Sequence, residues 1–157
     1  MRTPISVGCS ASMSLAAIGT GEVYAWGTGY LGCAASKLSS SVLKSSNLSA
    51  SVQRGEVGDD VNLRKSRIPK RVSELKSVRK VACGLDSHCA AITSEGALWT
   101  WGRGSFGRLG HGDDADHAYP RRVETFANLK MVVLQVACGE THTIAIAQDG
   151  AFCRRSC

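Results

Sequence analysis

Val81-Ala82-Cys83-Gly84 and Val136-Ala137-Cys138-Gly139 are the same tetrapeptide, placed 55 positions apart. The similarity continues after each copy, because His88 and His142 follow, and each is followed by an Ala-Ile pair and a glycine. A period close to fifty residues is typical of arrays such as propeller blades or solenoid turns. Units of this kind bury their apolar faces only against each other, so the repeat decides the fold.

A weaker copy opens the chain. It begins with Val7-Gly8-Cys9, and its Tyr24-Ala25-Trp26-Gly27 matches Trp99-Thr100-Trp101-Gly102 of the next unit. Ser10 stands in this copy where the other two have glycine, and Ser14 where they have histidine. The chain therefore holds two units and part of a third.

Each unit has the pattern of short antiparallel strands. Alternation along 97–101 puts Trp99 and Trp101 on one face of a strand. The segment 88–93 predicts the strand before it, and Ser94-Glu95-Gly96 is suited to a hairpin connection because glycine tolerates a positive φ. The sequence predicts an all-β fold, a partial β-propeller of four-stranded antiparallel blades.

These motifs together resemble the repeat of the regulator of chromosome condensation family. The resemblance implies that the chain is part of a propeller of about seven blades. The positions that carry the repeat are Trp26, Gly27, Cys83, Gly84, His88, Trp101, Gly102, Gly107, Gly110, Cys138, Gly139 and His142. We expect all of them to have structural roles.

The repeat suggests a division of the chain. We expect 1–20 to supply the end strands of a preceding blade, and 21–96 to form the first repeat. Residues 97–150 form the second repeat, and 151–157 a truncated third, in which Cys153 and Arg155 take the places of Trp99 and Trp101. A serine-rich insertion at about 33–62 is expected to be disordered, because its composition cannot bury enough apolar surface. Two full repeats cannot close a ring, so we expect a fragment, or a protein that needs partner blades.

The net charge of +6 is concentrated in one stretch. The basic patch consists of Arg64, Lys65, Arg67, Lys70 and Arg71. It is suited to nuclear import or to contact with nucleic-acid phosphates. The alternative is a solvated blade edge, where lysines discourage strand pairing.

Other features of the sequence indicate the cellular compartment of the protein. Seven cysteines without a C-x-x-C motif argue against a disulfide framework or a zinc ribbon, and free thiols favour the nucleus or the cytoplasm. The N-terminal segment aligns with the repeat, so we interpret it as a strand and not as a signal peptide. No run has the length of a membrane span, and no membrane partner is expected.

The sequence contains patterns that resemble enzyme or cofactor sites, but each is better explained as a turn or a loop. The segments 27–32 and 102–107 both read G-x-G-x-x-G, but further glycines and the absence of a βαβ pattern favour turns. His111 and His117 flank the acidic segment 113–116, which lacks the ligand order of a calcium loop. We therefore predict no catalytic residues, no cofactor and no metal.

Three functions follow as hypotheses. The first is a protein-interaction module, a scaffold with a chromatin or other protein partner, and with nucleic acid as a further partner through the basic patch. The second is guanine-nucleotide exchange on a Ran-type small GTPase, which the resemblance implies only for a complete propeller; Asp86 and 113–116 are the acidic residues available for a rim. The third is a fragment without activity of its own.

Overall fold

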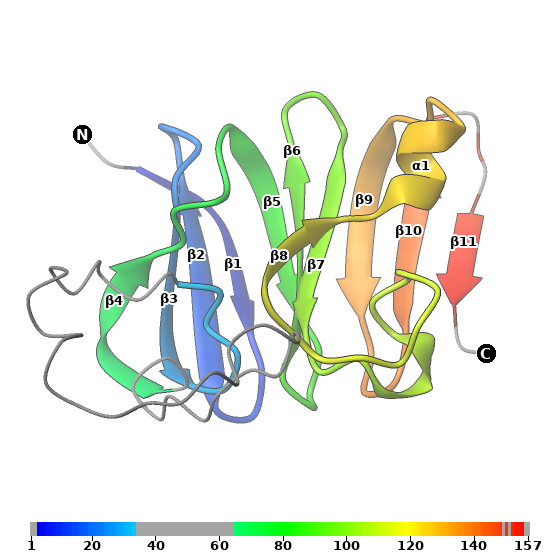
Figure 1. The fold of residues 1–157 in the computed structure, drawn as a ribbon. Coiled ribbons are helices and arrows are strands. Elements are labelled where there is room, and N and C mark those ends of the chain that lie inside the picture. The colour runs from blue at the N-terminus through cyan, green and yellow to red at the C-terminus, as the bar shows by residue number, and fades with distance from the viewer. Residues whose placement is uncertain (1–2, 34–64, 149, 151, 156–157) are drawn as a thin grey trace, which may run out of the picture.

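The chain folds into three antiparallel sheets that stand side by side, and the computed structural model describes residues 3–33, 65–148, 150 and 152–155 (Figure 1). Blade A consists of β1 (Pro4–Cys9), β2 (Met13–Ile18), β3 (Val23–Thr28) and β4 (Lys65–Arg71). Blade B consists of β5 (Val78–Cys83), β6 (His88–Thr93), β7 (Leu98–Gly102) and β8 (His117–Arg122). Blade C consists of β9 (Val133–Cys138), β10 (Thr143–Ala147) and β11 (Phe152–Arg155).

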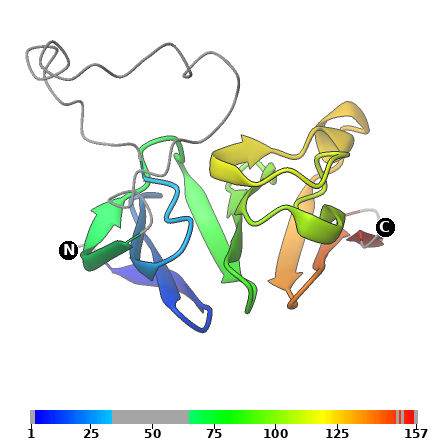
Figure 2. The ribbon, with the colours of Figure 1, turned by 60° about the horizontal axis from the view of Figure 1, so that its bottom comes forward.

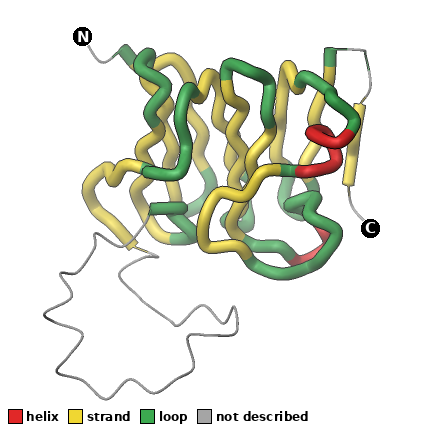
Figure 3. Tube along the Cα trace, turned by 45° about the horizontal axis from the view of Figure 1, so that its top comes forward, coloured by secondary structure: helices red, strands yellow, loops and turns green. Residues whose placement is uncertain are grey.

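The all-β prediction is confirmed. Helical structure in the described residues is limited to a 3₁₀ turn at Ser105–Gly107 and to α1 (Glu124–Asn128), which Figure 3 shows in red. The first strands of neighbouring blades pack together, with β5 in contact with both β1 and β9. Figure 2 shows the three sheets fanned next to one another, as blades of a propeller are. No helix in these residues is long and apolar enough to cross a membrane.

The sheets do not divide the chain as the repeat does. The sequence placed 1–20 in a preceding blade, whereas β1 and β2 lie in the same sheet as β3 and β4. The physical reason is that a repeat has a period but no intrinsic starting point, and each sheet begins inside one repeat and ends inside the next. The predicted disordered insertion falls on 34–64, which lie outside the described residues.

Strand pairing aligns the blades residue by residue. His88 faces Gly102 across β6 and β7, and Met13 faces Gly27 across β2 and β3. Met13 therefore holds the place of His88 in blade A, which corrects the sequence alignment that put Ser14 there. The alignment failed because the connection 84–87 is one residue longer than the connection 10–12.

One buried cluster joins blades A and B. Trp101 is fully buried in it. It packs with Leu15 and Val23 of blade A and with Leu31 and Val72, which follow β3 and β4. The indole Nε1 of Trp101 donates a hydrogen bond to the carbonyl oxygen of Tyr30 (3.1 Å). A second cluster joins blades B and C and contains no tryptophan; its members are Ala90, Ile92, Leu98, Val123, Phe126, Val133, Val136 and Ala145. The blades are thus held by side-chain burial between sheets, as the repeat requires.

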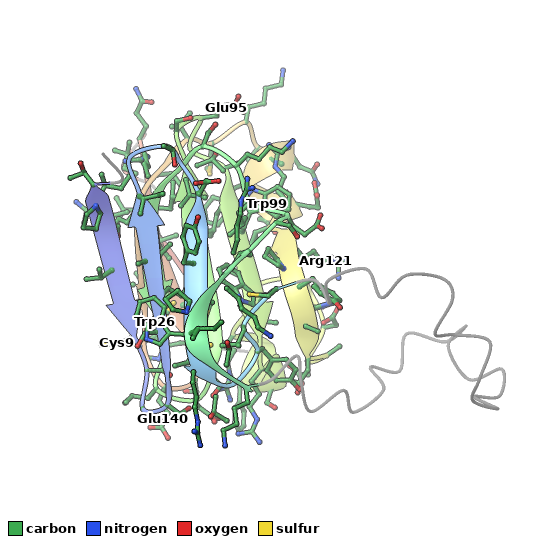
Figure 4. The ribbon with its side chains drawn as sticks, turned by 90° about the vertical axis from the view of Figure 1, so that its left-hand side faces the viewer. Cys9, Trp26, Glu95, Trp99, Arg121 and Glu140 are labelled. Atoms are coloured by element: carbon green, nitrogen blue, oxygen red, sulfur yellow. The ribbon has the colours of Figure 1, made fainter. Side chains whose placement is uncertain are left out.

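The two outer faces of the described blades are open. Ile5 and Val7 are 49% and 74% exposed on blade A, and Figure 4 shows Trp26 on this same side. Leu134 and Ile146 are exposed on blade C. These faces correspond to the ones that are buried between blades A and B and between blades B and C.

Glycine and histidine are coupled at one position of the repeat. A Cβ on Gly84 would overlap the His88 imidazole. Blade A has Met13 in place of the histidine, and there Ser10 takes the glycine position. The hydroxyl oxygen of Ser10 accepts a hydrogen bond from the backbone N–H of Met13 (3.0 Å). The two departures of the first unit from the repeat, Ser10 for glycine and Met13 for histidine, therefore compensate each other.

We expect Gly84→Ser to lower the free energy of unfolding by about 1–3 kcal/mol, because the new side chain overpacks the site of the imidazole. The double variant Gly84→Ser/His88→Met should lose less than the sum of the two single variants, since it removes the imidazole that the new side chain overlaps. It should stay less stable than the wild type, because the new Cβ still meets the carbonyl oxygen of Gly139. Urea unfolding followed by circular dichroism measures all three variants. Strictly additive losses would show that the two positions are independent.

Candidate functional site

The lower rim, at the bottom of Figure 1, is formed by the connections 84–87, 103–116 and 139–142. Two large apolar side chains are exposed there, Leu85 at 63% and Phe106 at 59%. Phe106 also has a left-handed backbone conformation with φ 64° and ψ 23°, which costs about 1–3 kcal/mol for a non-glycine residue. Exposed apolar groups on strained backbone are typical of binding surfaces.

Two carboxylates fix the loop that carries the exposed ring. Asp116 Oδ1 accepts a hydrogen bond from the backbone N–H of Gly104 (2.8 Å), and Asp114 Oδ1 accepts one from Gly107 (2.6 Å). The hydroxyl of Tyr30 donates to Asp116 Oδ2 (2.7 Å) and ties the loop to blade A. The strained conformation is therefore determined by its surroundings and does not relax freely.

The buried side chain of Arg108 holds the loops of the lower rim together. Its side chain is 1% exposed, and its Nε donates to the carbonyl oxygen of Ser105 (2.8 Å). Its Nη1 donates to Asp86 Oδ2 (3.0 Å) and to the carbonyl oxygen of Glu140 (3.0 Å). A buried guanidinium is tolerated only when its charge and its donors are satisfied in this way. Arg108 thereby joins the rim loops of blades B and C.

Asp86 lies at the centre of the rim's charges. The hydrogen bond from Arg108 lowers the pKa of this carboxyl, and Arg103 lowers it further through a contact of 2.6 Å between Nη1 and Oδ1. Asp86 is therefore ionised at neutral pH. The sequence nominated Asp86 as a rim acid, and the structure places it between the exposed Leu85 and two arginines.

Two histidines near the rim, His88 and His111, are kept neutral. Burial lowers the pKa of His88 to about 4, and the nearby Arg108 charge lowers it as well. His88 Nε2 lies 3.1 Å from Thr143 Oγ1, so it is held against blade C. Burial likewise lowers the pKa of His111 to about 4, and its Nε2 lies 3.0 Å from Thr100 Oγ1.

The side chains of the acidic segment 113–116 interact with other residues of the connection 103–116 and its neighbours. Asp113 Oδ1 lies 3.5 Å from His117 Nε2, and the rings of His111 and His117 pack edge to face at 4.9 Å. Within the described ranges, no group of three or more histidine, cysteine, aspartate or glutamate residues is arranged to hold a metal ion.

The glycine patterns form turns. A dinucleotide site needs a helix directly after the glycines. The segment 102–107 instead ends in the 3₁₀ turn, and the connection continues without a helix to β8. A Cβ on Gly102 would lie 2.8 Å from the Cα of His88. A Cβ on Gly32 would lie 2.7 Å from Nε1 of Trp101. Close backbone approach explains these glycines without a ligand.

Most of the basic patch lies on one outer strand. Lys65, Arg67 and Lys70 are exposed on β4, and Arg71 Nε lies 3.1 Å from Glu22 Oε1; Arg64 lies outside the described residues. Arg121 and Arg122 follow a proline on β8, as Lys70 and Arg71 do on β4. Figure 4 shows Arg121 on the outer side, between the two rims that Glu95 and Glu140 mark. The patch is thus separate from the exposed apolar residues of the lower rim.

The free thiols that the structure describes are those of Cys9, Cys33, Cys83, Cys89 and Cys138. Burial raises the pKa of Cys33 to about 11 and that of Cys138 to about 12. Burial also raises the pKa of Cys89, whose Sγ lies 3.8 Å from Cys83 Sγ. The thiols of Cys33, Cys89 and Cys138 are protonated at neutral pH and are poor nucleophiles.

Sequence reasoning missed Leu85, Phe106 and the anchoring role of Arg108. The one available signal was an aromatic residue between glycines in a polar loop, because such a residue has no core to join.

Two sequence models of the regulator of chromosome condensation (RCC1) repeat match residues 95–146 and 78–108. The human E3 ubiquitin-protein ligase HERC2 is 36% identical over 139 residues, which cover 87% of this chain and 2% of that protein. The ultraviolet-B receptor UVR8 of Arabidopsis thaliana is 31% identical over 147 residues, which cover 93% of this chain and 28% of that protein.

Solved structures show the same fold. Yeast RCC1 (Prp20), in its complex with Kap60, has a TM-score of 0.68 and 25% identity, covering 98% of this chain and 29% of that chain. Prp20p of Saccharomyces cerevisiae, in a structure described with its binding to Gsp1p and histones, has a TM-score of 0.70 and 20% identity, covering 92% of this chain and 31% of that chain. The chain thus spans less than a third of the relatives and structures it matches.

Proposed function

Because the chain belongs to the regulator of chromosome condensation (RCC1) repeat family, we propose that it is a propeller interaction module that binds a chromatin-associated protein through its lower rim. The observation that carries the proposal is Phe106, an exposed aromatic side chain on a strained backbone. A nuclear location is part of this proposal.

The chemistry of the lower rim suits a protein partner. Leu85 and Phe106 supply apolar contact area, and aromatic residues are enriched among the side chains that contribute most to binding. Glu140 adds an acidic side chain, whereas Asp86 is paired with Arg103 and Arg108, and Asp113 lies against Arg121 and His117. A basic protein segment that also carries apolar side chains would complement this surface. Histones are strongly basic chromatin proteins, and Prp20p has been studied for its binding to them.

We expect Phe106→Asn to weaken binding of the purified chain to histone dimers at least tenfold, measured by biolayer interferometry at physiological salt. Asparagine tolerates the left-handed conformation, but it loses the contact of the Arg108 guanidinium with the Phe106 ring, 5.7 Å from the ring centroid. The variant should therefore unfold at a similar urea concentration. Tyr119→Ser removes an aromatic side chain that is 42% exposed on β8 and serves as the matched control. Equal histone affinity for wild type and Phe106→Asn would refute binding through the lower rim.

Exchange on a Ran-type GTPase is measured in the same preparation. Gsp1p loaded with fluorescent GDP is mixed with catalytic amounts of the chain, and nucleotide release is followed. Accelerated release would show that the chain is an exchange factor and would contradict the interaction module as its function. Histone binding without acceleration supports the module.

A further inference from the structure

Two cysteines face each other across β5 and β6, which are neighbours in blade B (Figure 1). Cys83 at the end of β5 is the direct partner of Cys89 in β6. The thiol of Cys89 donates a hydrogen bond to Cys83 Sγ, with 3.8 Å between the two sulfurs. Opposed residues of antiparallel strands point to the same side of the sheet. The two side chains therefore lie in contact, and both pack in the cluster that joins blades A and B.

The backbone around this pair has the spacing that a disulfide needs. The N–H of Gly84 donates to the carbonyl oxygen of His88 (2.8 Å), so the next pair, Cys83 and Cys89, is of the type without direct backbone hydrogen bonds. Such pairs have Cα atoms about 4.5 Å apart, and disulfides join Cα atoms about 4.4–6.8 Å apart. The two sulfurs must close from 3.8 Å to about 2 Å. Because the Cα spacing already fits, rotation about the side-chain bonds can supply this change without separating the strands.

The other two blades pair the cysteine of the repeat with a hydroxyl group. In blade A, Cys9 faces Ser14 across β1 and β2. In blade C, Cys138 faces Thr143 across β9 and β10. A hydroxyl is therefore sufficient at the position that Cys89 occupies in blade B. Among the described blades, only blade B brings two thiols together across its first two strands.

The two thiols differ in their access to solvent. Cys89 is completely buried, whereas Cys83 is half-buried. A small oxidant in solution therefore reaches Cys83 first. Burial raises the pKa of Cys89 and keeps this thiol protonated at neutral pH. Its contact with Cys83 compensates for the low nucleophilicity, because groups held side by side react as if they were highly concentrated.

From this pairing we infer that Cys83 and Cys89 form a reversible disulfide when the chain meets hydrogen peroxide. The Cys83 thiolate attacks one peroxide oxygen, the O–O bond breaks, and Cys83 becomes a sulfenic acid while hydroxide leaves. The Cys89 sulfur then attacks the Cys83 sulfur, and an S–S bond forms as the S–O bond breaks. The leaving hydroxyl group takes the proton of Cys89 and departs as water. Two thiols thus lose two electrons and two protons, and one peroxide becomes two water molecules.

The disulfide would join the two ends of the connection 84–87, which carries Leu85 on the lower rim. A bond that forms on oxidation and is reduced again is compatible with a reducing compartment, where disulfides are usually transient and redox-sensing. The inference does not depend on the partner proposed for the lower rim, because the oxidation of the thiols is measured on the chain alone.

Peptide mapping by mass spectrometry tests the bond directly. The reduced, purified chain is treated with a small excess of hydrogen peroxide, its remaining thiols are alkylated with iodoacetamide, and trypsin cleaves after Lys80 and Arg103. The released peptide 81–103 holds Cys83 and Cys89 and no other cysteine. We expect this peptide to carry no alkyl group and to be lighter than its reduced form by two hydrogen atoms.

Cleavage before Asp86 separates Cys83 from Cys89 in the sequence, so the two pieces should stay joined until dithiothreitol is added. Dithiothreitol given to the oxidised chain before alkylation should restore two alkylated cysteines, as a reversible bond requires. A main product in which Cys83 is alkylated, is a sulfinic acid, or is joined to a different cysteine would overturn the inference.

Cys89→Thr is the decisive variant, because it gives blade B the cysteine and threonine pair of blade C. Without the second thiol, Cys83 should stop at the sulfenic acid, and dimedone should label it at least about fivefold more than in the wild type. Cys138→Ala is the matched control, since it removes the cysteine of the same repeat position in blade C and should leave the disulfide unchanged. If Cys89→Thr does not fold, Cys89→Ser recreates the pair of blade A and takes its place. Equal dimedone labelling of Cys83 in the wild type and the folded variant would show that Cys89 does not react with oxidised Cys83, and the inference would fail.

Discussion

Trp101→Ala is expected to lower the free energy of unfolding by about 3–5 kcal/mol, the range for removing a large aromatic side chain from a packed core. Trp101 is fully buried between blades A and B, and its indole N–H is satisfied by Tyr30. The alanine variant therefore loses buried apolar area, leaves a cavity and lacks the hydrogen bond to Tyr30. Such a loss is a large part of the stability of a typical domain, about 5–15 kcal/mol.

Trp26→Ala is the matched control, because Trp26 holds the same place in blade A. It is only half-buried, on the open side that Figure 4 shows. We expect it to cost about 1 kcal/mol. Urea unfolding followed by far-ultraviolet circular dichroism compares the two, since tryptophan fluorescence itself changes in both variants. Equal losses would contradict the view that the chain is held together by indole insertion between blades A and B.

Acidification from pH 7 to pH 4 is expected to destabilise the chain, with His88 contributing about 3 kcal/mol. Burial lowers the pKa of His88 from an ordinary value of 6.5 to about 4. Between these values the unfolded chain binds a proton that the folded chain does not, so stability is full above pH 6.5 and falls as the pH drops towards 4. Below about pH 4 both states are protonated and this loss is complete.

His88→Gln tests this origin, because glutamine does not titrate and still offers polar atoms to Thr143. Stability measured by urea unfolding at intervals from pH 7 to pH 4 should depend less steeply on pH in the variant than in the wild type. His111 titrates in the same window and accounts for part of the slope that remains. Asp86 contributes only at the acidic end of this range, because the stability from its lowered pKa is lost as the pH falls below about 5. It is present in both proteins, so the difference between their slopes isolates His88. An identical slope in wild type and variant would exclude His88 as a source.

The candidate site was only partly visible in the sequence. Asp86 was nominated only as one of the acids available for a rim, and it does lie in the connection 84–87 of the lower rim. Phe106 was hidden, because a sequence shows that a residue is aromatic but not that its ring points to solvent on a left-handed backbone. The role of Arg108 was hidden too, because only the fold brings its side chain within reach of Asp86 and the carbonyl oxygen of Glu140.

The sequence by itself determined the type of fold, the period of the repeat and the family, because apolar alternation and turn glycines are local properties that each unit repeats. Val81-Ala82-Cys83-Gly84 and Trp101-Gly102 were enough for that. Only the tertiary structure decided which strands share a sheet, because a periodic pattern has no starting point of its own. It also decided that Met13 replaces His88, since hydrogen-bond register and not residue count aligns strands across connections of unequal length. The burial of Trp101 between blades A and B likewise depends on contacts between residues distant in sequence, so it appears only once neighbouring sheets are packed.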